Sequence, residues 1–128
     1  MARFAPTLAE IEAIARAALA EIPASLRAYV VDVPILVMDF PDPDVEAEMG
    51  LESPFDLLGL YQGVSLDRKG AGQTSEDVDR IFLYRRPLLD YWCESGASLE
   101  AIVRNTLIHE IGHHFGFSDA DMDRLEAE

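Results

Sequence analysis

The three histidines of this chain lie close together, at His109, His113 and His114, and Glu110 directly follows the first of them. His109 and His113 are four positions apart, which on an α-helix is about one turn, or roughly 6 Å along the axis. Both imidazoles can therefore reach one metal ion from the same side of a helix. Glu110 lies on the same surface, where it can accept a proton from metal-bound water. This H-E-x-x-H spacing predicts a zinc-binding helix that carries its own general base.

A turn and an acidic residue follow the second histidine. Gly116 stands where a left-handed residue ends a helix, so the chain can turn back and deliver Asp119 to the metal. Two imidazoles and one carboxylate leave the fourth zinc position open, as catalytic sites require. The alternative for Asp119 is structural, because an acid in the first turn of a helix is favoured by the helix dipole alone. We predict His109, His113 and Asp119 as zinc ligands.

Other reactive side chains have simpler interpretations. His114 lies about 100° further round the helix than its neighbour, so we expect it to pack in the core or to support a ligand. Cys93 is the only cysteine, which excludes an intrachain disulfide, and we expect a buried structural thiol. Tyr61, Tyr84 and Arg85 are candidates for stabilising an oxyanion, although each residue type is more often a packed aromatic or a solvated charge.

The histidine pair needs a helix to position it, and the sequence predicts one from Ser98, as the N-cap, to about Phe115. His109 and His113 lie together on one flank of that helix. The other side is apolar and can face the core, so the helix can form the floor of a cleft. Ser118 and Asp121 form an S-x-x-D cap for a last short helix. The apolar side consists of Val103, Leu107, Ile108, Ile111 and Phe115.

The rest of the chain alternates predicted helices and strands. Thr7 and Glu10 form a capping box for an amphipathic first helix that Pro23 ends. Pro34 places the first strand at a sheet edge or a bulge, whereas the last strand is apolar on both faces and suits an inner position. Strands are predicted over 30–38, 57–66 and 79–85, and a helix with Pro87 in its first turn is predicted to run through about Glu94. A surface loop with at most one helical turn is expected over 39–56, and a mobile loop over 68–76.

Composition limits the possible partners and location. The 128 residues fit one domain, over 1–128, and 24 acidic against 10 basic residues give a net charge of −14. That charge repels nucleic acids and anionic membrane surfaces, so we expect neither as a partner. No apolar run approaches the roughly 18 residues of a membrane span. With one cysteine and an amphipathic, not signal-like, N-terminus, we expect a cytoplasmic protein.

The run from His109 to Asp119 resembles that of small bacterial zincin-like proteins, sometimes called minimal zincins and classed as metallopeptidases. The segments 57–63 and 79–87, and the first helix ending in Ile22-Pro23, are also similar to that family. The resemblance extends from about Leu8 to Asp121. It implies an α+β fold, zincin-like, in which a small mixed β-sheet packs against an N-terminal helix and a central active-site helix. It implies the same zinc ligands and base.

The function that follows is zinc-dependent peptide hydrolysis, with a peptide or protein as substrate and Glu110 as base. Metzincins carry a methionine turn well downstream of the third ligand, and Met122 is too close to Asp119 for that part. A non-catalytic zinc-binding or protein-interaction module is therefore one alternative. A zinc-dependent ribonuclease is a weaker one, because position 119 is not histidine and the net charge disfavours RNA.

Overall fold

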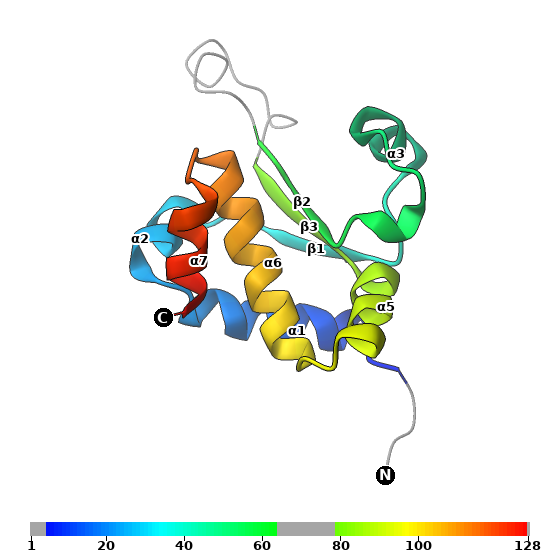
Figure 1. The fold of residues 1–128 in the computed structure, drawn as a ribbon, viewed down its shortest axis with the longest axis horizontal. Helices are drawn as coiled ribbons and strands as arrows, with labels where there is room; N and C mark the ends of the chain where they lie inside the picture. The colour runs from blue at the N-terminus through cyan, green and yellow to red at the C-terminus, as the bar shows by residue number, and fades with distance from the viewer. Residues whose placement is uncertain (1–4, 64–78, 128) are drawn as a thin grey trace.

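The protein is described by a computed structural model that covers residues 5–63 and 79–127. Helices surround a small mixed sheet, which confirms the predicted α+β class (Figure 1). In the described ranges, each helix is too short or too polar to cross a membrane. The helices are α1 Leu8–Glu21, α2 Ala24–Arg27, α3 Pro43–Met49, α5 Arg85–Ser95, α6 Leu99–His114 and α7 Asp119–Ala127. Short 3₁₀ turns span Ala28–Val30 and Pro54–Asp56. The strands are β1 Ile35–Met38, β2 Gly59–Gln62 and β3 Arg80–Tyr84.

The sheet has the order β1-β3-β2, with β1 parallel and β2 antiparallel to the central strand. Ile81 and Leu83 of β3 are fully buried, which confirms the inner position predicted from its apolar faces. Pro34 directly precedes β1, and its carbonyl accepts a hydrogen bond from the Ile81 N–H at 3.0 Å. The edge position predicted for this strand is also correct, because β1 pairs on one side only within the described sheet.

The core lies between the sheet and two long helices. Helix α1 begins with the predicted capping box, since Thr7 Oγ1 accepts from the Glu10 N–H at 3.1 Å and Glu10 Oε1 from the Thr7 N–H at 3.2 Å. It packs against α6 and β1. Helix α6 packs against β2 as well, so it is fixed by apolar contacts on one side while its histidine flank stays outside the core. The buried residues of α6 include Val103, Leu107, Ile108 and Ile111, as predicted.

Two predictions about the first half of the chain are wrong in detail. The strand expected over 30–38 begins only at Ile35, because a 3₁₀ turn ends at Val30 and Asp32 adopts a left-handed φ of 71°. Proline at 34 also has no N–H to donate to a ladder. The stretch 39–56 contains a seven-residue helix, α3, where at most one turn was expected; Pro43 occupies its first turn, a favoured site for proline.

The remaining boundaries differ by a few residues. The strand expected over 57–66 is β2, four residues long, and the part of that prediction from 64 onward lies outside the described residues. The loop expected over 68–76 lies outside them too. Helix α5 begins at Arg85, so Pro87 lies in its first turn as predicted, where the missing N–H of proline needs no partner.

Gly59 fixes how closely β2 approaches α6. A Cβ at this position would lie 2.9 Å from both the Phe82 carbonyl oxygen and Thr106 Cγ2. We therefore expect Gly59→Ala to destabilise the protein by about 1–3 kcal/mol through overpacking, measured by denaturant unfolding. The double variant Gly59→Ala/Thr106→Ser should recover only part of this loss, since the Phe82 carbonyl remains. A single variant as stable as wild type would contradict the close approach.

Candidate metal centre

The predicted metal-binding helix forms as expected. Ser98 Oγ accepts from the Ala101 N–H at 3.1 Å and begins α6. Past His114 the chain reverses, with Gly116 at a left-handed φ of 82° and the Phe117 N–H donating to the Gly112 carbonyl at 2.8 Å. This reversal is what brings α7, and with it Asp119, back along α6.

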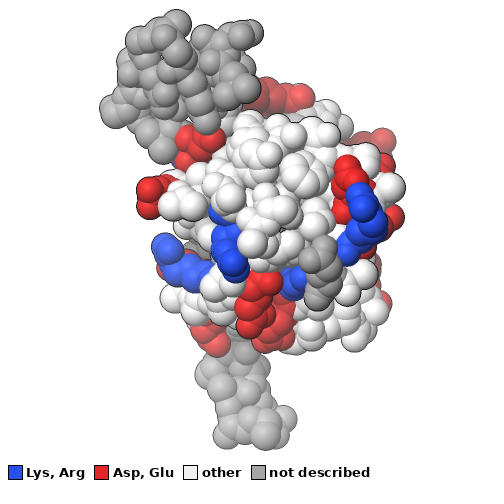
Figure 2. All heavy atoms as spheres, turned by 90° about the vertical axis from the view of Figure 1, so that its left-hand side faces the viewer, with Lys and Arg blue, Asp and Glu red and all other residues white. Residues whose placement is uncertain are grey.

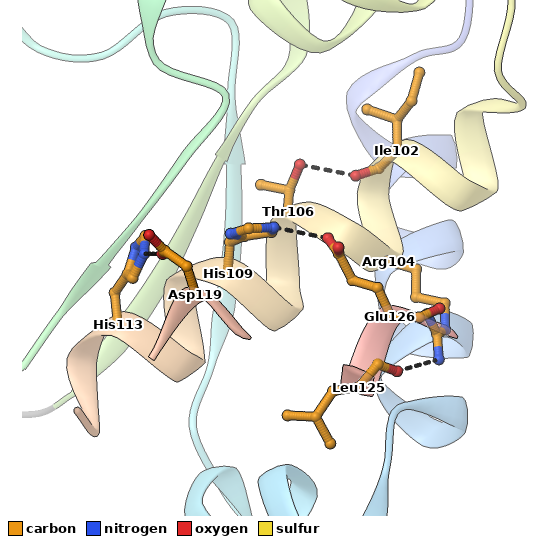
Figure 3. A network of polar contacts seen from close by, with 8 residues as sticks. All are labelled: Ile102, Arg104, Thr106, His109, His113, Asp119, Leu125 and Glu126. Carbon is orange, nitrogen blue, oxygen red and sulfur yellow. Dashed lines mark hydrogen bonds and ion pairs between the residues drawn. The ribbon is translucent and has the colours of Figure 1, made fainter. Parts of the chain in front are cut away.

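The histidine pair faces α7 (Figure 3). The ring centroids of His109 and His113 are 5.8 Å apart. His113 Nε2 lies 3.5 Å from Asp119 Oδ1, and His109 Nε2 lies 2.7 Å from Glu126 Oε1. Each imidazole thus has a carboxylate of α7 beside its outer nitrogen. Glu126 was not among the residues predicted for the site.

These donors fit the chemistry of a zinc site. Imidazole nitrogens and carboxylate oxygens are zinc ligands, and two ligands of a tetrahedral site with bonds of about 2.1 Å stand about 3.4 Å apart. The 3.5 Å between His113 and Asp119 agrees with that spacing, whereas the 2.7 Å between His109 and Glu126 is a hydrogen-bonding distance. Within residues 5–63 and 79–127, however, no three His, Cys, Asp or Glu side chains are gathered closely enough to share a metal. The donors stand as two pairs, which side-chain rotation must bring together around an ion.

Glu110 lies on the inner side of the histidine pair. Its Oε1 accepts a hydrogen bond from the Tyr61 N–H of β2 at 3.2 Å. Burial raises the pKa of Glu110 above its usual range, while that hydrogen bond and the charges of His113 and His109 act in the opposite direction. A carboxyl group with a raised pKa is a stronger base than an exposed one, as proton abstraction near neutral pH requires.

A cavity of about 440 Å³ opens beside these groups. His109, Glu110 and Glu126 line it together with Gly59, Tyr91 and Asn105. Its size is within the range of pockets that bind small molecules or single side chains of larger ones. The predicted base and one predicted ligand therefore face a space that a substrate group can enter.

Tyr61 is one of the residues proposed for oxyanion stabilisation, and its backbone N–H donates the hydrogen bond to Glu110. Its hydroxyl donates to Asp79 at 2.8 Å, and burial together with Asp79 raises the pKa of this phenol. Tyr84 is buried, and this burial, together with the negative charges of Asp42 and Glu110, raises the pKa of its phenol to about 12. Arg85 is engaged elsewhere, by the Pro6 carbonyl at 2.6 Å and by Asp39 at 3.0 Å.

One expectation about reactive side chains is wrong, and another is excluded in part. His114 is exposed, which excludes the core position; its ring stacks on Tyr61 with centroids 4.0 Å apart, and its support of a metal ligand stays a prediction. Cys93 is exposed as well, because α5 buries only its first turns, at Pro87 and Leu88. Periodicity did not reveal either outcome, since both residues lie near helix ends where the apolar side gives way to solvent.

The acidic charge is not uniform over the surface. Figure 2 shows the side of the molecule on which α2 and α7 lie, and there basic and acidic side chains are interspersed around a broad uncharged area. The net charge of −14 therefore does not form an unbroken acidic field on this side.

The chain belongs to the zincin-like metallopeptidase family, whose model matches residues 30–128. Membership indicates a metal-dependent hydrolase. The structure is similar to that of a conserved hypothetical protein from Thermo thermophilus, with a TM-score of 0.53 and 20% sequence identity over 85% of this chain and 94% of that one. At this identity the likeness concerns the fold. No curated protein matches the sequence.

Proposed function

We propose that this protein is a zinc-dependent peptidase that hydrolyses a peptide bond with Glu110 as general base. The observation that carries the proposal is the position of Glu110. It lies beside two histidines at ligand spacing, is held by the backbone of β2, and faces a cavity of about 440 Å³. Family membership supports the same reaction class.

His109, His113 and Asp119 would hold the metal. When bound, zinc supplies Lewis acidity, which lowers the pKa of a coordinated water to near neutrality. Glu110 takes the proton of the attacking water and can return it to the leaving amine, so one carboxyl group serves both steps. The Tyr61 N–H keeps that carboxyl group oriented while it is charged, because the hydrogen bond is made to Oε1.

The experiment is a metal analysis followed by a digestion. Protein purified without added metal should contain about one zinc per chain, and it should cleave members of a broad peptide library. Removing the metal with a chelator should abolish cleavage, and adding zinc back should restore it. Zinc-loaded protein that cleaves no peptide in the library would count against the peptidase assignment.

One observation favours a second candidate, a zinc-binding module without activity. Glu126 provides a fourth donor next to His109. Catalytic zinc sites keep one position open, whereas structural ones are filled by four protein ligands. A site that keeps four protein ligands when a substrate is present would belong to this second class.

Asp119 provides a test of the ligand set. We expect Asp119→Ala to weaken zinc binding at least about tenfold, as the loss of a metal ligand should. Asp121→Ala is the matched control: Asp121 accepts from the Ser118 N–H, and this cap holds its pKa below the usual range. Losing this bond should lower the stability of α7 only slightly and leave zinc affinity unchanged. Equal losses of affinity in both variants, measured by chelator competition, would assign Asp119 to the helix and not to the metal.

A further inference from the structure

Helix α7 brings two carboxylates to the histidine flank of α6. Asp119 and Glu126 are seven positions apart, which is about two helical turns, so they lie on the same face of α7. Asp119 stands beside His113, and Glu126 stands beside His109. The two contacts belong to one helix–helix arrangement (Figure 3).

The Glu126 end of α7 is firmly attached to α6. Arg104 donates to the carbonyls of Glu126 and Leu125, at 3.1 and 3.5 Å, where the last carbonyls of a helix otherwise need partners. Met122 is fully buried and packs over Gly112, where an added Cβ would lie 2.6 Å from its sulfur. These contacts hold the backbone of α7 at Glu126 against α6, so the Glu126 side chain starts beside the histidine flank.

The two carboxylates differ in how they are held. The side chain of Glu126 is 23% exposed, and its oxygen is at hydrogen-bonding distance from His109. The side chain of Asp119 is 91% exposed, and its oxygen is 3.5 Å from His113. A partly buried carboxylate is screened less by water than an exposed one, so it attracts a nearby cation more strongly.

We propose that Glu126 is an additional metal ligand, which closes the fourth position of the site at rest. The inference builds on the proposed metal site. Glu126 Oε1 lies 2.7 Å from the same His109 nitrogen that would bind the metal, so the two side chains would have to move apart to hold one ion between them. Glu126 also lines the cavity next to Glu110. Release of the Glu126 carboxylate from the metal would therefore open a coordination position toward the cavity where substrate is expected. Helix α7, which carries Glu126, would then control the access of substrate to the metal.

The test compares Glu126→Gln with Asp123→Asn, which removes the same charge from an exposed position of α7. Zinc affinity is measured by competition with a chromophoric chelator. We expect Glu126→Gln to raise the dissociation constant at least about tenfold, and Asp123→Asn to change it less than about twofold.

A second experiment uses the proteins with cobalt in place of zinc. Azide should perturb the visible spectrum of Glu126→Gln and leave that of wild type unchanged, because only the variant has an open coordination position.

Two results would overturn the proposal. Unchanged affinity in Glu126→Gln, with its melting temperature maintained, would make Glu126 a packing contact between helices. Tighter zinc binding would make it a competitor that keeps metal away from His109. Failure of the metal site itself looks different: His109→Ala would then keep its zinc. Loss of zinc in His109→Ala with unchanged affinity in Glu126→Gln would overturn this inference alone.

Discussion

His109→Ala should purify with almost no zinc, whereas wild-type protein should carry about one ion per chain. The substitution removes one of two imidazoles that approach each other at 5.8 Å on α6. A site reduced from two imidazoles to one loses the chelate that the four-residue spacing creates, so affinity should fall by several orders of magnitude. Elemental analysis of protein purified without added metal measures the effect.

His114→Ala is the matched control for this experiment. His114 is the same residue type one position beyond the second predicted ligand, but its ring stacks on Tyr61. Its loss should leave the zinc content near one per chain and remove the ring contacts with Tyr61 and Phe115, at about 0.5–1.5 kcal/mol each. Zinc content that stays at the wild-type level in His109→Ala, or that falls only in His114→Ala, would place the metal elsewhere.

The sequence predicted those parts of the fold that depend on local signals. Thr7, Ser98 and Gly116 mark helix ends through hydrogen bonds or backbone angles that each residue type favours, and all three ends were placed correctly. The inner position of β3 followed from its apolar faces. The extent of β1 did not, because Val30 and Val31 have high strand propensity, while the turn at Asp32 and the Pro34 that follows it decide where pairing begins.

The arrangement of the candidate site was predictable to the extent that its residues lie on one helix. The spacing of His109, Glu110 and His113 sets their relation on α6 whatever the rest of the fold does. Glu126 differs, since its contact with His109 depends on how α7 packs on α6. The only sequence signal was its position two turns after Asp119, on a helix with several other acids. The support of Glu110 by Tyr61 depends in the same way on the placement of β2 beside α6.

The variant Glu110→Gln should keep the fold and the metal. The amide oxygen of glutamine can still accept the hydrogen bond from the Tyr61 N–H, so the link to β2 is preserved. Burial raises the pKa of Glu110 above its ordinary value of 4.5, so the folded state binds this proton more tightly than the unfolded state does. As the pH rises above 4.5, the cost of the buried carboxylate therefore lowers the stability of the folded protein. Glutamine has no such charge. At pH 7 the metal-free variant should therefore melt no lower than metal-free wild type.

With zinc bound, Glu110→Gln should lose peptide hydrolysis by a factor of about 10² or more, because an amide cannot accept the proton of the attacking water. Cleavage of a broad peptide library by wild type and variant measures this, alongside the zinc content of both. Glu100→Gln is the control, as it removes an exposed carboxylate from the first turn of the same helix and should retain full activity. If Glu110→Gln cleaves as fast as wild type, the activity comes from a contaminant or another site. If both proteins hold zinc and neither cleaves, the centre is a binding module in which Glu110 supports the zinc site through β2 without acting as a base.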